Sequence, residues 1–160
     1  MNHLAVIGGG SWGTALALAL APKHSSVRLW VFESDLAVTI NRTRVNDVFL
    51  PGFALPDNVE AVTDLSWAVQ GAETVLGVMP SHHARSGDSQ LAPHVTADML
   101  FVSATKGLEQ DSLLRISEVM REVFSPCVAA RIGVLSGPTF PRELARREPA
   151  AIVLPSTDAH

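Results

Sequence analysis

Three glycines near the amino terminus have a spacing that suits the binding of a phosphate group. They are Gly8, Gly10 and Gly13, in a Gly-x-Gly-x-x-Gly turn. In such a turn the first glycine permits the tight bend, the second lets the backbone approach a pyrophosphate, and the third lets the following helix pack closely on the strand. The amides and the dipole at the start of that helix favour negative charge. A glycine-rich turn without a ligand is the alternative, and the surrounding elements decide between the two.

The segments on either side of the glycines match the context that a dinucleotide site needs. The apolar run 4–7 is typical of a buried strand, and residues 11–21 have the composition of a helix that Pro22 ends. A strand before the glycines and a helix after them is what this motif requires. The sequence therefore predicts that the turn binds the pyrophosphate of a dinucleotide. Trp12, inside the turn, either covers the pyrophosphate or packs beneath it.

Three later turns also carry polar residues or glycine at the ends of predicted strands. They are 80–82 (Pro-Ser-His), 105–107 (Thr-Lys-Gly) and 136–139 (Ser-Gly-Pro-Thr). Ligands of a doubly wound sheet bind at the carboxyl ends of its strands, so these turns and the glycine turn are expected to converge on one rim. Lys106, one of two lysines in the chain, would bring a positive charge there to hold a substrate phosphate or hydroxyl. A solvated loop lysine is the alternative.

Glu33 is the candidate for choosing between two dinucleotides. It follows the second predicted strand, about 20 residues beyond Gly13. An acidic side chain at this place accepts hydrogen bonds from the adenosine ribose 2′-hydroxyl and repels a 2′-phosphate, which favours NAD over NADP. Asp35 is a competing candidate, and a plain charge at a helix N-terminus is the structural alternative for Glu33.

Strands and helices alternate along the whole chain. Strands are expected at 4–7, 27–32, 73–79, 99–103, 132–135 and 150–154, and helices at 11–21, 34–44, 65–69, 82–91, 113–124 and 140–147. Nearly continuous apolar strands separated by helices imply a mostly parallel sheet covered on both faces. The expected fold is therefore α/β, doubly wound and of the Rossmann type, with residues 1–160 as one dinucleotide-binding domain.

Composition argues against several other functional classes. The net charge is −4 with both signs interspersed, which gives no argument for nucleic acid or an anionic membrane. No apolar run approaches the ~20 residues of a membrane span. Cys127 is the only cysteine, so an internal disulfide is excluded, and a cytoplasmic location is expected. His82 and His83 would point apart on a helix and lack further ligands nearby, so no metal site is expected.

Together these turns closely resemble the N-terminal domain of bacterial-type NAD(P)-dependent glycerol-3-phosphate dehydrogenase. The resemblance covers nearly all 160 residues in the family's order. It is carried by the stretches 8–15, 27–30, 46–52, 80–82, 104–109 (Ala-Thr-Lys-Gly-Leu-Glu) and 136–140 (Ser-Gly-Pro-Thr-Phe). The last two are much more specific than the glycine turn.

The resemblance implies a reversible hydride transfer between the nicotinamide C4 of NAD or NADP and C2 of sn-glycerol 3-phosphate or dihydroxyacetone phosphate. This reaction would supply a precursor of glycerophospholipids. By position, the resemblance implies cofactor contacts at Ser11, Trp12, Lys106 and Pro141, and substrate contacts at Lys106, Gly137 and Thr139.

Two departures from the family's pattern concern the cofactor. Family members often carry Arg or His where this chain has Phe32. Because that cation is lost while Glu33 is kept, the case for NADP is weaker. Position 141 is usually Ala but is Pro141 here, and proline has no backbone N–H to donate.

The family also has a helical C-terminal domain, which supplies the general acid–base lysine, further phosphate ligands and much of a homodimer interface. Residues 1–160 stop before that lysine, so we expect them to bind cofactor but to turn over poorly on their own. Two alternatives stay open from the residues alone. One is a non-catalytic dinucleotide-sensing module, and the other is a related 6-phosphogluconate- or β-hydroxyacid-type dehydrogenase.

Overall fold

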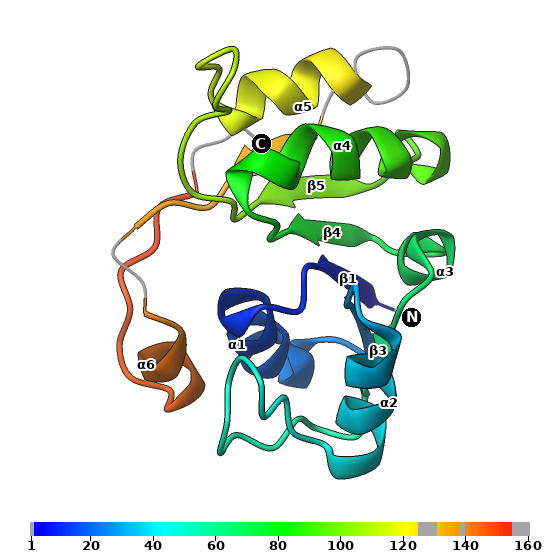
Figure 1. Cartoon of the computed structure of the whole chain (residues 1–160), viewed down its shortest axis with the longest axis vertical. Helices are drawn as coiled ribbons and strands as arrows, with labels where there is room; N and C mark the ends of the chain where they lie inside the picture. Colours follow the sequence, from blue (N-terminus) through cyan, green and yellow to red (C-terminus); the bar gives the residue numbers. More distant parts are fainter. Residues whose placement is uncertain (1, 125–130, 138–139, 155–160) are drawn as a thin grey trace.

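A computed structural model describes residues 2–124, 131–137 and 140–154, which form a layered α/β fold (Figure 1). The strands are β1 (His3–Ile7), β2 (Ser26–Trp30), β3 (Val59–Val62), β4 (Thr74–Gly77), β5 (Leu100–Ser103) and β6 (Ile132–Val134). All neighbouring pairs are parallel, in the order β3-β2-β1-β4-β5-β6. This is the doubly wound Rossmann order, in which the direction of winding reverses between β1 and β4. The fold class expected from the sequence is confirmed.

Helices cover both faces of this sheet. They are α1 (Ser11–Leu20), α2 (Ser34–Thr43), α3 (Leu65–Val69), α4 (Ser81–Leu91), α5 (Ile116–Phe124) and α6 (Pro141–Ala145). Short 3-10 turns, Ala21–Lys23 and Ala92–His94, follow α1 and α4. In Figure 1, α4 and α5 lie on one side of the sheet, while α1 and α2 lie on the other.

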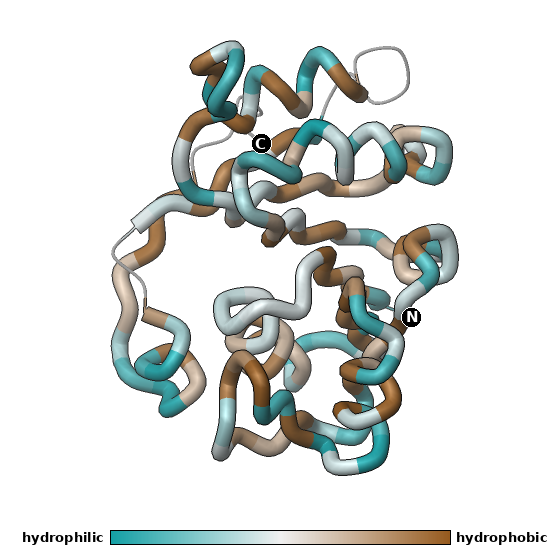
Figure 2. The backbone as a smooth tube through the Cα atoms, viewed as in Figure 1, coloured by the Kyte–Doolittle hydropathy of each residue, from teal (hydrophilic) through white to brown (hydrophobic). Residues whose placement is uncertain are grey.

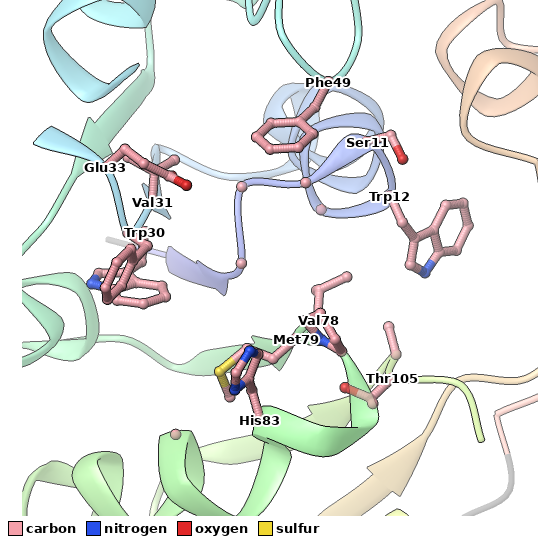
Figure 3. Close-up of a pocket in the computed structure, with 18 of the residues that line it drawn as sticks. Ser11, Trp12, Trp30, Val31, Glu33, Phe49, Val78, Met79, His83 and Thr105 are labelled. Carbon is pink, nitrogen blue, oxygen red and sulfur yellow. The ribbon is translucent and has the colours of Figure 1, made fainter. Parts of the chain in front are cut away.

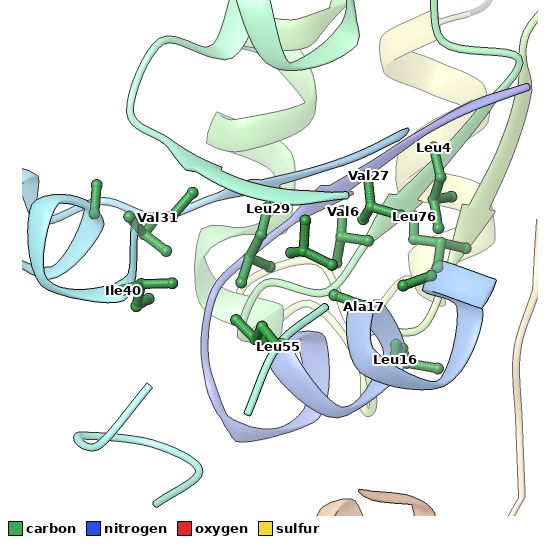
Figure 4. Close-up of a cluster of buried hydrophobic side chains, with 14 of the residues drawn as sticks. Leu4, Val6, Leu16, Ala17, Val27, Leu29, Val31, Ile40, Leu55 and Leu76 are labelled. Atoms are coloured by element: carbon green, nitrogen blue, oxygen red, sulfur yellow. The ribbon is translucent and has the colours of Figure 1, made fainter. Parts of the chain in front are cut away.

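Alternate side chains of β1 enter two separate hydrophobic clusters. Leu4 and Val6 belong to the cluster that includes α1 and α2 (Figure 4). Ala5 and Ile7 belong to the cluster under α4 and α5. Successive side chains of a strand point to opposite faces, so a strand buried on both faces is apolar throughout. Figure 2 accordingly shows hydrophobic stretches along the central strands.

The short strand β3 is absent from the sequence prediction. It follows the turn-rich loop 46–58 and pairs with β2 at the edge of the sheet. Only Glu60 of its four residues is exposed. With so few residues and one charge, Val59–Val62 has too little periodic signal to be distinguished from the end of a loop.

The predicted strand 150–154 is wrong. These residues lie outside the sheet, and Val153 forms an isolated antiparallel bridge with Ser136. Ile152, Val153 and Leu154 are exposed. Apolar, β-branched composition indicates a strand only where a neighbouring strand is available to pair with it, and Ser136 offers a single bridge.

The boundaries of two predicted helices also differ. The helix predicted from residue 113 begins at Ile116, because Leu113 has a φ of +58° in the left-handed region and cannot continue a helix. The helix predicted over 140–147 covers only Pro141–Ala145, and Arg147 beyond it has a φ of +61°.

Candidate functional site

A cleft of about 810 Å³ lies at the carboxyl ends of β1 and β4. This is where the strand order reverses and where ligands of such sheets bind. The volume is within the ~300–1,000 Å³ typical of ligand sites. The cleft is lined by every residue that the sequence predicts at the cofactor: Gly8, Gly10, Ser11, Trp12, Gly13, Glu33, Lys106 and Pro141.

Of the three predicted substrate residues, Lys106 lines the cleft. Gly137 is not among the described residues that line this cleft. It has a φ of +146°, and a Cβ there would lie 2.5 Å from the carbonyl oxygen of Ala151. Glycine therefore allows the turn after β6 to pack against residue 151. Thr139 and Cys127 lie outside the residues that the structure describes.

The three glycines of the turn differ in what surrounds them. A Cβ at Gly8 would lie 2.5 Å from the carbonyl oxygen of Val78, and a Cβ at Gly13 would lie 1.8 Å from that of Gly8. A Cβ at Gly10 would have no atom within 4 Å. Gly8 and Gly13 are therefore required by the packing of the turn itself. Gly10, by contrast, leaves open space facing the cleft.

The first turn of α1 presents donors to this open space. Gly10 is the N-cap of α1 and supplies no side-chain cap, and no acidic residue occupies the first turn. The first amides of a helix lack internal partners and attract anions. The indole N–H of Trp12 is buried and has no hydrogen-bond partner among the residues described. The first amides of α1, which face the open space at Gly10, fit the pyrophosphate of a dinucleotide.

The side chain of Glu33 stands at the opposite end of the cleft from Trp12 and Thr105 (Figure 3). Glu33 is the N-cap of α2, but its side chain makes no capping hydrogen bond. Asp35, the competing candidate, is exposed and is not among the described lining residues. The neighbouring Phe32 is 80% exposed. Glu33 thus lines the cleft, whereas Asp35 is not among the described residues that do.

Lys106 is the only lysine or arginine among the described residues that line the cleft. It follows β5, and its Nζ lies 5.7 Å from the centroid of the Trp12 ring. This distance is within the range of a cation–π contact. Other arginines near β2 have structural partners: Arg28 stacks on Trp67 at 3.8 Å, and Arg44 donates to the carbonyl of Val59 at 2.8 Å.

Several lining residues lie outside the predicted set. They include Trp30, Met79, His83 and Gly87. Trp30 Nε1 donates to the carbonyl of Thr63 at 2.8 Å, and the Trp30 ring also faces the cleft (Figure 3). His83 lies just after the turn that follows β4. A sequence argument could therefore have predicted it at the cleft, because residues that follow strands meet at one rim.

Phe49 is the lining residue with the weakest sequence signal. It sits above the glycine turn on the loop between α2 and β3 (Figure 3). Asn46 anchors this loop: its buried Nδ2 donates to the carbonyl of Gly9 and to Thr14 Oγ1, both at 2.9 Å. Its Oδ1 accepts from the amide of Phe49 at 3.2 Å. One amide side chain therefore ties the loop to the turn.

The described residues contain no group of three or more His, Cys, Asp or Glu placed to hold a metal ion. The expectation that His82 and His83 point apart is wrong, because their ring centroids are 4.1 Å apart, with the ring planes at 52° to each other. In the same part of the chain, none of the helices has the length and apolar character needed to cross a membrane.

Comparison with known proteins agrees with this geometry. The family model described as the NAD-dependent glycerol-3-phosphate dehydrogenase N-terminus matches residues 3–160. The chain belongs to this family. Within it, the chain is 46% identical over 159 residues to a glycerol-3-phosphate dehydrogenase [NAD(P)+] of Koribacter versatilis, covering 99% of this chain and 47% of that protein.

Solved structures of glycerol-3-phosphate dehydrogenases have the same fold. The enzyme from Coxiella burnetii is 33% identical with a TM-score of 0.89, over 99% of this chain and 47% of that one. The enzyme from Saccharomyces cerevisiae is 28% identical with a TM-score of 0.84, over 97% and 47%. The chain thus spans about half the length of these relatives. These findings support the glycerol-3-phosphate dehydrogenase interpretation over the sensing module and the other dehydrogenase type.

Proposed function

We propose that this chain is the cofactor-binding domain of an NAD(P)-dependent glycerol-3-phosphate dehydrogenase. The observation that carries the proposal is the open N-terminus of α1. There Gly8 and Gly13 are closed in by backbone atoms, while Gly10 faces empty space in the cleft. This is the arrangement in which a helix N-terminus receives a pyrophosphate.

The proposed binding mode follows from the positions of the lining residues. The pyrophosphate lies against the first amides of α1, next to Ser11. The adenosine lies at the opposite end, where Glu33 accepts from the ribose and the ring of Trp30 forms an apolar wall. The Trp12 and Lys106 end then takes the nicotinamide, which accepts or donates the hydride when bound.

Lys106 is proposed to serve substrate as well as cofactor. Its ammonium charge complements a phosphate or a polarised oxygen of sn-glycerol 3-phosphate or dihydroxyacetone phosphate. Pro141, at the start of α6, also lines the cleft and contributes apolar contact but no N–H. Gly137 and Thr139 remain proposed substrate residues on the family resemblance. A cytoplasmic location and a homodimeric full-length enzyme are proposed on the same basis.

A titration with NADH tests the proposal directly. We expect purified residues 1–160 to bind NADH, as measured by its fluorescence, and to reduce dihydroxyacetone phosphate with little or no turnover. Gly10→Val places methyl groups in the open space of the turn and should weaken NADH binding at least ~100-fold, about 2.7 kcal/mol. The melting temperature should change little, because nothing lies within 4 Å of a Cβ at this position. A folded chain that shows no NADH binding would contradict the proposal.

We propose further that the cofactor is NAD rather than NADP. Glu33 would repel a 2′-phosphate, and Phe32 supplies no cation to attract one. Replacing Glu33 with Gln removes the negative charge and keeps the shape, so the preference for NADH over NADPH should fall about tenfold. Asp35→Asn removes a neighbouring exposed charge that does not line the cleft, and it should leave the ratio of the two dissociation constants unchanged. Tighter binding of NADPH than of NADH by the unmodified chain would exclude this preference.

A further inference from the structure

The turn that carries Lys106 is held against one face of α4. A Cβ at Gly107 would lie 3.6 Å from Ser81 Oγ, so the backbone of this turn packs directly on the start of α4. Four residues further along the helix, Arg85 binds Glu109. Side chains at i and i+4 of a helix lie on the same face. Two residues of α4, Ser81 and Arg85, therefore contact the segment that follows Lys106, at Gly107 and Glu109.

The second of these contacts is a two-point ion pair. Arg85 Nε donates to Glu109 Oε1 at 2.7 Å, and Nη2 donates to Oε2 at 2.9 Å. The Glu109 side chain is only 14% exposed, and its Oε2 also accepts from Ser112 Oγ. A guanidinium fork matches both oxygens of a carboxylate at once, which an ammonium group cannot do. The pair therefore sets a distance and an orientation between helix and turn.

Both partners connect to elements that line the cofactor cleft, although neither partner lines it. Pro80, the N-cap of α4, and His83 and Gly87 within the helix form part of the cleft wall. Across from them, the turn places Lys106 Nζ 5.7 Å from the Trp12 ring. The spacing between α4 and the turn therefore determines where the Lys106 ammonium stands relative to the open end of α1.

We propose that Arg85 and Glu109 form a positioning pair that holds Lys106 at the cleft. This inference rests on the proposed function, because Lys106 is taken to contact the cofactor. The pair acts through Lys106 and does not itself touch ligand.

Two variants test the pair by NADH titration. Glu109→Gln removes one charge without changing the shape, and Arg85→Lys keeps the charge but loses the fork. Each should weaken NADH binding about tenfold. Glu122→Gln is the matched control, because Glu122 is the other partner of Arg85, at 2.9 Å, and its side chain is 55% exposed. This control should bind NADH within twofold of the unmodified chain.

A test in a chain that also carries Lys106→Met distinguishes a positioning role of the Arg85–Glu109 pair from a general structural one. In a Lys106→Met chain, Glu109→Gln should cause no further loss of NADH affinity, since the residue through which the pair acts is gone. A merely structural pair would lower affinity equally in both backgrounds, because effects of independent sites add. Equal losses in the two backgrounds would therefore overturn the inference, as would unchanged affinity in both Glu109→Gln and Arg85→Lys.

Failure of the inference can be told apart from failure of the proposed function. If the unmodified chain binds NADH and the two variants bind it equally well, only the positioning role is wrong. If the unmodified chain is folded and does not bind NADH, the proposed function itself is wrong.

Discussion

Replacing Gly13 with alanine is expected to destabilise the domain by at least ~3 kcal/mol. The added Cβ would lie 1.8 Å from the carbonyl oxygen of Gly8 and 3.0 Å from its carbonyl carbon. Neither group is the end of a flexible side chain. To make room, α1 must move away from β1, and the packing of α1 on Val6 would then be lost.

An opposing effect has to be weighed against this clash. Gly13 lies inside α1, and alanine is favoured over glycine within a helix by about 1 kcal/mol. At most helical positions the substitution would stabilise the protein. Here the Cβ would overlap the backbone carbonyl of Gly8, which cannot rotate away as a side chain can, so the steric cost exceeds the gain in helix propensity and the net effect is destabilising.

Thermal unfolding measures the outcome, with Gly10→Ala as the matched control. In a domain of this size each 1 kcal/mol shifts the melting temperature by roughly 2–4 °C, so Gly13→Ala should lower it by roughly 10 °C. Gly10 has a φ of −69° and free space around a Cβ, so its alanine variant should melt within about 2 °C of the unmodified chain. Equal melting temperatures for Gly13→Ala and the unmodified chain would refute the packing argument.

Replacing Asp88 with asparagine is expected to stabilise the domain above neutral pH. Asp88 is 3% exposed on α4, and burial raises the pKa of its carboxyl from 3.8 to about 7, against a smaller opposing effect of Arg85. The folded chain therefore binds a proton more tightly than the unfolded chain does. The free energy of unfolding is therefore highest below pH 3.8, where the carboxyl is protonated in both states. It falls as the pH rises, and the loss is complete once the pH has passed about 7 and the buried carboxyl is ionised.

The loss in the free energy of unfolding follows from the difference between the pKa of Asp88 in the unfolded and folded chains. Each pKa unit corresponds to 1.36 kcal/mol, so a shift of this size costs on the order of 4 kcal/mol once the group is ionised. Asparagine has nearly the same shape and carries no charge at any pH. Its variant should have an unfolding free energy close to that of the unmodified chain at pH 4, and higher by roughly 2–4 kcal/mol at pH 8.

Urea unfolding at a series of pH values between 4 and 8 checks this prediction. The range stays above the region in which Glu109, with its pKa lowered to about 2 by hydrogen bonds from Arg85 and Ser112, loses its charge. Asp35→Asn changes an exposed aspartate and should show a difference that does not vary with pH. A difference for Asp88→Asn that is equally independent of pH would mean that this carboxyl is not the group responsible.

The predicted cofactor residues were accessible from sequence because their signals are local. The glycine turn joins β1 to the first turn of α1, and Glu33 and Lys106 lie in the turns that follow β2 and β5. In a parallel sheet the carboxyl ends of all strands face one way, so residues that follow strands meet at one rim. The order of strands, turns and helices along the chain, with this one rule, was therefore enough to predict that these residues line one cleft.

Residues placed by contacts across the chain could not be predicted in this way. Phe49 reaches the cleft because Asn46 binds Gly9, 37 residues away in sequence. The spacing of residues within the loop does not predict the contact between Asn46 and Gly9. The strand β3 depends in the same way on its pairing with β2, since its own pattern is too short to identify it.

The sequence by itself determined the doubly wound fold, the glycine turn and the family, because periodic apolar runs and glycine spacing are properties of neighbouring residues. Tertiary structure alone decided what depends on partners distant along the chain. It placed residues 150–154 outside the sheet, with one bridge to Ser136. It also joined Arg85 of α4 to Glu109 beyond β5. The type of a residue determines which groups it can bind, but only the packing of separate elements decides which of those groups lies within contact distance.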